Sequence, residues 1–265
     1  MATAGVLHLP SSPLGSVKAL VFDIVGTMTD WLSPVQAALE AHHPSIKLNF
    51  NATEFAYEWR AAFFAAAKGS TATTRPHTLF RSTLDEVCSK HGIGLEDWDD
   101  ATRSKLIASW ADMKAWSDTI DGMERLRTKF ILVGLSNLPA EVLVNAHRHN
   151  GMHFDLLLAA DGFDEYKPSP STYGSVLEAL RLQGHECAMV AAHVYDLRGA
   201  RSTHGFRTIY VVRNQELVLE PPEARDGNIM RSEFDLVVEE ATGGGGGLLE
   251  VAAALEQLRG DQPNN

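Results

Sequence analysis

The chain contains Lys18-Ala-Leu-Val-Phe-Asp23-Ile-Val-Gly-Thr27-Met-Thr-Asp30, an apolar run that stops at an acid and leads into a Gly-Thr turn. Residues 20–22 are apolar at consecutive positions, which is typical of a strand buried on both faces of a parallel sheet. Asp23 lies directly after this strand, at its carboxyl end. Open α/β sheets bind ligands at the carboxyl ends of their strands. Gly26 allows the backbone to bend sharply after the acid. The stretch predicts a buried strand that delivers one carboxylate, and an ordinary strand ending in a turn Asp is the alternative.

Composition and charge restrict the classes of partner. The 265 residues are 45% hydrophobic, enough for a full core, and the formal net charge is -11. No run of Lys and Arg offers the basic patch that phosphate binding requires, so no nucleic-acid partner is expected. Cys88 and Cys187 are expected to be buried thiols, because no CxxC pair or zinc-type spacing occurs. No apolar stretch approaches the roughly 20 residues that span a bilayer, so we expect no membrane partner and a cytoplasmic location.

The chain divides into a helical insert and an alternating α/β region. Residues 1–16, which include Pro, Ser and Gly clusters, are expected to form a flexible leader. From Trp31 to about Trp116 the pattern is that of amphipathic helices, the first beginning at Ser33-Pro34. All five tryptophans fall in this span, which predicts a compact unit with its own core. From residue 120 onward, strands and helices alternate, which indicates βαβ units and a parallel sheet.

Two later segments carry no predicted chemistry. We interpret residues 214–232 as a polar excursion before a last short strand, and the glycine run 243–247 as a flexible hinge before a terminal helix.

The clearest helix of the insert begins after Asn51, which can cap it, and has an apolar stripe at helical spacing. Arg60 lies beside this stripe, one residue past Trp59, so its side chain can turn toward the sheet.

Polar residues follow three of the predicted core strands, and a lysine and a tyrosine occur in a loop and helix between them. These residues are Asp23, Thr27, Ser136, Asn137, Lys167, Tyr173, His193 and Asp196. Taken singly, each has an ordinary explanation as a helix cap, a first-turn acid or a solvated side chain. Because the carboxyl ends of parallel strands meet at one edge of a sheet, together they predict a site there.

In this order, the motifs resemble those of the haloacid dehalogenase superfamily, and within it those of the type II 2-haloacid dehalogenases. Asp23-Ile-Val-Gly-Thr27 is similar to the nucleophile motif, and Trp59-Arg60 resembles the part of the cap helix that carries the halide-binding arginine. Three further stretches of this chain resemble the family's second, third and fourth motifs, in that order. They are Leu135-Ser136-Asn137, Tyr166-Lys167-Pro168 and Val190-Ala-Ala-His-Val-Tyr-Asp196. The resemblance covers about residues 17–260. It implies an α/β fold: a Rossmann-like, doubly wound parallel sheet core at residues 17–32 and 117–260, with an inserted helical cap domain at 33–116.

Two positions separate this chain from the Mg²⁺ phosphatases that make up most of the superfamily. Phosphatases carry a general-acid Asp two residues after the nucleophile, where this chain has Val25. They also carry a metal-binding acid in the fourth motif, where this chain has Ala192. Mg²⁺ requires near-octahedral oxygen ligation, so the sequence predicts no metal and no other cofactor. Halide displacement needs neither a metal nor a proton donor, because the halide leaves as a weakly basic anion.

The resemblance implies a role for each residue. Asp23 would attack the α-carbon and form an ester, held by Lys167 and Ser136; Arg60 and Asn137 would receive the halide. Asp196 would activate the water that opens the ester, with Thr27 and Tyr173 orienting these groups. Substrate contacts are expected from Ile24, Val25, Arg60, Ser136 and Asn137. His193 stands where the family commonly has Asn, and both a hydrogen-bonding or water-activating role and a purely structural role stay open.

The expected function is metal-independent hydrolysis of 2-haloalkanoic acids to 2-hydroxy acids, with a small halogenated carboxylic acid as substrate. A first alternative keeps the Asp23 nucleophile but uses it on a different, larger biosynthetic substrate, since fold does not fix function. A second alternative is a non-enzymatic member whose cap binds a partner, which an exposed apolar patch on the cap would favour. A homodimer paired through the cap is the expected assembly.

Overall fold

A parallel sheet of six strands organises the structure, which is a computed structural model describing residues 13–44, 50–68, 76–159, 162, 165–239 and 247–260. The strand order is β5-β4-β1-β6-β7-β8, and all neighbouring pairs are parallel. The strands are β1 (Ala19–Phe22), β4 (Ile131–Ser136), β5 (Leu156–Ala159), β6 (Cys187–Ala191), β7 (Arg207–Val211) and β8 (Leu236–Val238). The central strand β1 is buried throughout, as its continuous apolar run predicted.

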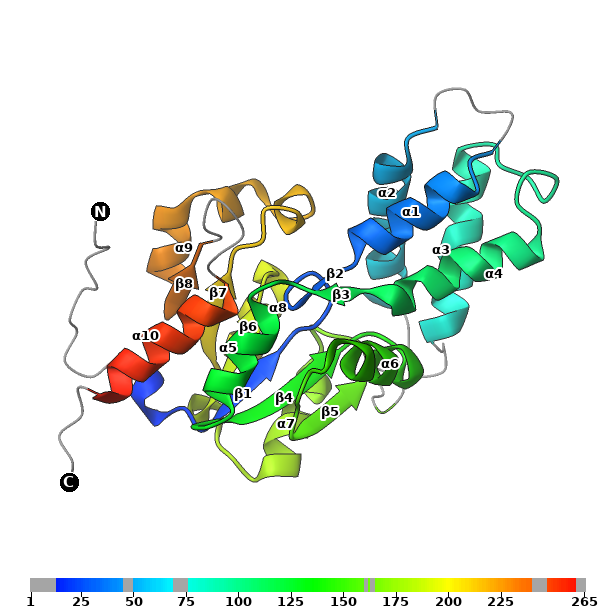
Figure 1. Ribbon diagram of the computed structural model, residues 1–265. Helices are drawn as coiled ribbons and strands as arrows, with labels where there is room; N and C mark the ends of the chain where they lie inside the picture. The colour runs from blue at the N-terminus through cyan, green and yellow to red at the C-terminus, as the bar shows by residue number, and fades with distance from the viewer. Residues whose placement is uncertain are drawn as a thin grey trace.

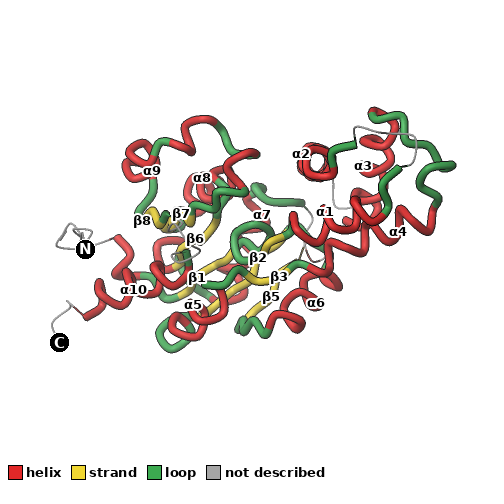
Figure 2. Tube along the Cα trace, turned by 45° about the horizontal axis from the view of Figure 1, so that its top comes forward, coloured by secondary structure: helices red, strands yellow, loops and turns green. Residues whose placement is uncertain are grey.

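Helices cover both faces of this sheet (Figures 1 and 2). One layer consists of α5 (Thr119–Leu126), α6 (Ala140–Asn150) and α10 (Leu248–Gly260). The other consists of α7 (Pro170–Leu180), α8 (Val194–His204) and α9 (Gly227–Glu233). Alternate residues of β1 serve the two layers, with Leu20 and Phe22 in one apolar cluster and Ala19 and Val21 in the other. The predicted doubly wound α/β fold is confirmed.

A helical unit lies to one side of the sheet (Figure 1). It contains α1 (Leu32–Ala41), α2 (Ala52–Lys68), α3 (Pro76–Lys90), α4 (Asp100–Ala108) and a 3-10 helix, Ser109–Asp112. Its interior is aromatic: Trp31, Trp59, Trp98 and Trp110 are all buried in one cluster. Two short antiparallel strands, β2 (Thr29–Asp30) and β3 (Lys114–Ala115), connect it to the sheet. The sequence did not predict this ribbon, because two residues are too few for an alternating pattern to show.

Several local predictions need correction. Helix α1 begins at Leu32, and Asp30 rather than Ser33 accepts hydrogen bonds from its first N–H groups, at 3.0 and 3.1 Å. The expected flexible leader falls partly on residues 1–12, outside the described ranges. Pro13–Ser16 form a 3-10 helix, contrary to that expectation, because Leu14 is buried in the core. The glycine run also lies mostly outside the described residues.

Two other local predictions are confirmed, and the interpretation of one later segment needs correction. Asn51 Oδ1 accepts from the backbone N–H groups of Thr53 and Glu54, so it caps α2. Cys88 and Cys187 are buried free thiols. The segment 214–232, interpreted as a polar excursion, instead contains the 3-10 helices Glu216–Val218 and Pro222–Arg225, followed by most of α9.

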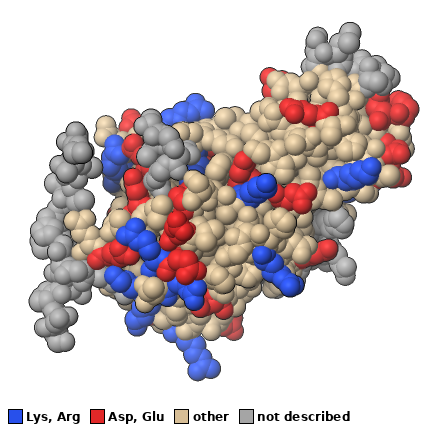
Figure 3. Space-filling model, viewed as in Figure 1, with Lys and Arg blue, Asp and Glu red and all other residues tan. Residues whose placement is uncertain are grey.

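Acidic and basic side chains are interspersed over the face of the molecule in Figure 3, with acidic residues gathered at the outer end of the cap. On this face, acidic side chains therefore occur on both the cap and the core. No helix in the described part of the chain is both long and apolar enough to cross a membrane.

Candidate active site

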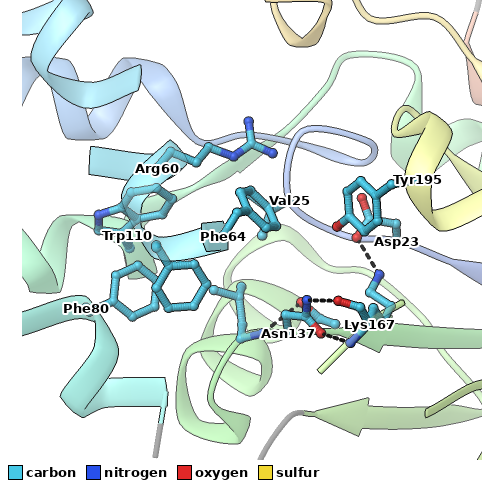
Figure 4. Close-up of a pocket in the computed structure, with 12 residues that line it drawn as sticks. Asp23, Val25, Arg60, Phe64, Phe80, Trp110, Asn137, Lys167 and Tyr195 are labelled. Carbon is cyan, nitrogen blue, oxygen red and sulfur yellow. Dashed lines mark hydrogen bonds and ion pairs between the residues drawn. The ribbon is translucent and has the colours of Figure 1, made fainter. Parts of the chain in front are cut away.

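A small pocket lies where the carboxyl ends of β1 and β4 meet the cap (Figure 4). The centre of a water molecule can occupy about 20 Å³ of it, room for one or two waters. The core domain contributes Asp23, Asn137, Lys167 and Tyr195, and the cap contributes Arg60 together with the rings of Phe64, Phe80 and Trp110. The lining residues are Asp23, Val25, Arg60, Phe63, Phe64, Phe80, Trp110, Ser136, Asn137, Leu138, Lys167 and Tyr195.

Asp23 is held by three donors at the end of β1. Its Oδ1 accepts from Lys167 Nζ at 2.8 Å, and its Oδ2 accepts from Thr27 Oγ1 at 2.7 Å and His193 Nδ1 at 2.8 Å. Burial alone would raise the pKa of Asp23, but the positive charges of Lys167 and His193 outweigh it and hold the pKa well below the usual value. Asp23 is therefore an ionised carboxylate. Among the described residues, its Oδ1 has one hydrogen-bond donor and its Oδ2 has two.

Lys167 reaches the site from the loop before α7. Its ammonium donates to Asp23 Oδ1, to the Leu135 carbonyl at 2.9 Å and to Asp196 Oδ2 at 2.6 Å, one acceptor for each hydrogen. Burial would lower the pKa of Lys167, but the carboxylates of Asp196 and Asp23 raise it above the usual value. Asn137 fixes the loop, because its amide bonds both the N–H and the C=O of Lys167, at 2.8 and 3.2 Å.

Asp196 is completely buried behind Lys167. Its Oδ1 accepts from the Tyr173 hydroxyl at 2.7 Å, and its Oδ2 accepts from Lys167. Burial raises the pKa of Asp196, while Lys167 acts in the opposite direction. Tyr173 does not line the pocket and contacts Asp196 alone among the predicted residues, so it can only orient that carboxylate.

Arg60 extends from α2 of the cap toward the sheet and is 1% exposed. Its guanidinium lies 4.5 Å over the Trp31 ring and forms an ion pair with Glu216 of the core domain. Its Nη2 is 3.0 Å from His193 Nε2, which itself lies 2.9 Å from Glu216 Oε2. Arg60 Nε is buried and has no hydrogen-bond partner among the described residues, which makes it an unsatisfied donor in a side chain that lines the pocket.

The sequence did not reveal Glu216. It lies in the segment interpreted as a polar excursion, 156 residues from Arg60, and matches no motif. The one local signal is that Glu216 is followed by three apolar residues, Leu217, Val218 and Leu219, whereas the residues before it are polar.

The predicted substrate contacts are mostly at the pocket, with one exception. Val25, Arg60, Ser136 and Asn137 line it, whereas Ile24 does not. Ile24 is buried in the sheet core, since its side chain points toward Gly134 of β4. Ser136 Oγ accepts from the Leu138 N–H at 3.2 Å, and its expected hydrogen bond to Asp23 is not among those that the described residues form.

Comparison with known proteins identifies the family. A model of haloacid dehalogenase-like hydrolases matches residues 17–204. The chain belongs to this hydrolase family. The (S)-2-haloacid dehalogenase of Pseudomonas fluorescens is 22% identical over 224 residues, covering 82% of this chain and 93% of that enzyme. The (S)-2-haloacid dehalogenase of Pseudomonas sp. (strain YL) is 25% identical over 219 residues, covering 80% and 90%.

Solved structures of the haloacid dehalogenase-like family have the same architecture. The crystal structure of the L-2-haloacid dehalogenase PA0810 superposes with a TM-score of 0.74 at 28% identity, covering 91% of this chain and 99% of that one. The shared region includes both the sheet and the helical cap.

Proposed function

We propose that this haloacid dehalogenase-like hydrolase removes the halogen of 2-haloalkanoic acids without a metal ion, producing 2-hydroxy acids through an ester on Asp23. One observation supports it above the others. A buried, ionised Asp23 lines the same pocket as the cationic Arg60, whose Nε has no hydrogen-bond partner within the described part of the chain. The names of the relatives agree with this chemistry.

In the first step, a lone pair of Asp23 Oδ1 forms a bond to C2 of the substrate, and the carbon–halogen bond breaks with its electron pair leaving on the halide. Displacement from the opposite side inverts the configuration at C2. Arg60 offers the departing anion a positive charge in a water-poor pocket, where such an interaction is strong. Asn137 uses one amide hydrogen on the Lys167 carbonyl and has a second for the halide.

In the second step, water attacks Cγ of the ester and releases the hydroxy acid. Asp196 is the proposed base, since its raised pKa makes it a better proton acceptor than an ordinary carboxylate. Lys167, bonded to both Asp23 and Asp196, links the two carboxyl groups.

Magnesium-dependent phosphoryl transfer does not fit these residues. The position of the usual general acid holds Val25, whose aliphatic side chain lines the pocket, and the position of the usual metal-binding acid holds Ala192. Ala192 instead donates its N–H to Thr27 Oγ1 at 2.8 Å. Neither side chain offers the oxygen ligand or the proton that this chemistry requires.

The size of the pocket favours a short substrate. About 20 Å³ is open to water centres inside it, whereas a neighbouring groove between cap and core offers about 770 Å³. Phe80 and Trp110 line both spaces, so their rings stand between them. The alternative of a larger substrate would have to extend past these two rings into the groove.

The test is halide release from the two enantiomers of 2-chloropropionate, each measured with EDTA and with added Mg²⁺. We expect turnover that EDTA leaves intact and Mg²⁺ does not raise, with inverted lactate as product. Reproducible Mg²⁺-dependent hydrolysis of a phosphate ester, without halide release from either enantiomer, would contradict the proposal.

A further inference from the structure

Arg213 is a buried cation that lies shortly after β7 and does not line the pocket. Its Nη1 and Nη2 donate to Oδ1 and Oδ2 of Asp118, both at 2.8 Å, and its Nε donates to the Thr27 carbonyl at 3.1 Å. The planar fork of a guanidinium can make these connections at the same time, whereas an ammonium group cannot. Arg213 therefore fixes the Asp118 side chain and the Thr27 backbone relative to each other.

The two partners of Arg213 lie next to the two connections between cap and core. Thr27 comes shortly before β2, and Asp118 comes shortly after β3. These two strands pair with each other where the cap meets the sheet (Figure 1). Trp116, between β3 and Asp118, donates its indole N–H to the Gly26 carbonyl at 3.1 Å, and the Arg213 guanidinium lies 5.4 Å over its ring. The nucleophile loop is thus held by Arg213 and Trp116, neither of which belongs to the pocket.

Asp118 is itself held in place by the start of α10. Its Oδ2 also accepts from the Leu248 N–H at 2.6 Å. A Cβ at Gly247, where φ is +58°, would lie 2.3 Å from Asp118 Oδ2 and 2.8 Å from Arg213 Nη1, so a side chain there would displace the pair. Both carboxylate oxygens of Asp118 have donors, which offsets the cost of burying the ion pair. The Arg213–Asp118 pair is therefore a fixed support for the loop.

Thr27 connects this support to the nucleophile. Its hydroxyl donates to Asp23 Oδ2 at 2.7 Å, and its carbonyl accepts from Arg213. A β-branched side chain has few allowed χ1 rotamers, so the direction of the hydroxyl follows the backbone of Thr27. Loss of the Arg213 donor would let this backbone shift and would carry the hydroxyl away from Asp23.

We propose that Arg213 is a positioning residue for ester formation. By holding the Thr27 carbonyl, it keeps the Thr27 hydroxyl on Asp23 Oδ2 and thereby orients Oδ1 for attack on C2. Asp118 fixes the guanidinium in this position. A misplacement of about 1 Å can cost about 10²-fold in rate, so a small shift of the loop is enough. The inference rests on the proposed dehalogenation, to which it adds two residues outside the pocket.

The alternative role of the Arg213–Asp118 pair is purely structural. In that case its loss would lower the free energy of unfolding and leave the rate of each folded molecule unchanged. A positioning role predicts a slower reaction in folded protein, and it also predicts that the slowing depends on the Thr27 hydroxyl.

The test is a double-mutant cycle between Arg213→Lys and Thr27→Val. Lys keeps a positive charge but lacks the planar fork with its Nε donor, and Val keeps the shape of Thr without its hydroxyl. Ester formation is followed in single turnovers, with enzyme in excess over 2-bromopropionate, by quenching and mass spectrometry of the intact protein. Arg213→Lys alone should slow it by about tenfold or more, with the steady-state KM changed less than about threefold. In the Thr27→Val background it should slow it by less than about threefold, because the group through which Arg213 acts is absent.

Arg103→Lys is the matched control, at a buried arginine of the cap with the same kinds of contact. Arg103 is 6% exposed, forms an ion pair with Asp85 and donates from Nε to the Trp98 carbonyl at 2.9 Å. It does not line the pocket. Urea unfolding should show reduced stability for both Lys variants, whereas only Arg213→Lys should slow ester formation.

Two results would overturn the assignment and leave the dehalogenation intact. One is equal slowing by Arg213→Lys in both backgrounds, and the other is a folded Arg213→Lys protein that forms the ester at the wild-type rate. If Arg213→Lys does not fold, Asp118→Asn, which keeps one oxygen acceptor for the guanidinium, replaces it in the cycle with the same expected dependence on Thr27. A wild-type protein that forms no ester overturns both proposals.

Discussion

The Nζ atom of Lys167 lies 2.8 Å from Oδ1 of Asp23, although 144 residues separate them in the chain. The contact forms because β1 and β4 are neighbours in the sheet and the Lys167 loop is fastened to the end of β4 through Asn137. It begins a row of alternating charges that continues from Asp23 through His193 and Glu216 to Arg60. This row joins the core domain to the cap, so the nucleophile and the proposed halide site belong to one network.

Arg60→Ala should reduce the rate of halide release to less than a tenth, equivalent to more than about 1.4 kcal/mol of transition-state stabilisation. The variant loses the cation opposite Asp23 and leaves Glu216 without its guanidinium partner. Initial rates with 2-chloropropionate measure the effect, and circular dichroism reports on the fold. Arg127→Ala, at a half-exposed position of the core, is the matched control and should retain full activity. A folded Arg60→Ala protein that keeps more than a tenth of the rate would disprove the halide role.

His193 should make stability depend on pH. Its pKa is about 10 in the folded protein and 6.5 ordinarily, so the stabilisation from its ion pairs is complete below pH 6.5 and is lost as pH rises toward 10. The free energy of unfolding should fall by up to ~1.4 kcal/mol per pH unit within this window. Urea unfolding at pH 6, 7, 8 and 9 measures it. His193→Asn should lack this slope and exposed His153→Asn should keep it; equal slopes in all three proteins would refute the protonated state.

Trp110 should limit the length of the substrate. Trp110→Ala joins the pocket to the groove, so kcat/KM for 2-bromohexanoate relative to chloroacetate should rise at least about tenfold, the effect of one or more buried methylenes. Trp110 also stacks on Trp31 at 5.2 Å, and thermal unfolding therefore accompanies the assay. Ile107→Ala, which alters the groove wall but not the pocket, should leave the ratio unchanged. No change in a folded Trp110→Ala protein would mean that the substrate enters and extends elsewhere.

Asp196→Asn should separate the two chemical steps. The amide cannot act as the base, but Asp23 and its donors from Thr27 and His193 remain. We expect one equivalent of halide to be released and a covalent adduct on Asp23 to accumulate, visible as a mass increase of the intact protein. Ser232→Ala, on the exposed end of α9, is a distant control. Steady turnover by Asp196→Asn would mean that a group other than Asp196 activates the water.

The sequence predicted the sheet and the position of most site residues because both depend on local signals. Apolar runs specify the strands, and the parallel arrangement places Asp23, Ser136 and His193 at one edge. The core packing of the Ile24 side chain was not predicted, since adjacent residues after a strand can point to opposite sides and only packing decides which. Glu216 could not be predicted, because its significance comes from contacts with Trp31 and Arg60 across the domain boundary.

The covalent route is tested most directly by one turnover in ¹⁸O-water with enzyme in excess over 2-chloropropionate. Because the new hydroxyl oxygen is predicted to come from Asp23, the first product should be unlabelled and a peptide spanning Asp23 should carry the label. Asp23→Asn should be inactive, since an amide is a poor nucleophile. Label appearing in the hydroxy acid on the first turnover would contradict the account: Asp23 would then be a general base, and water would attack the substrate carbon itself.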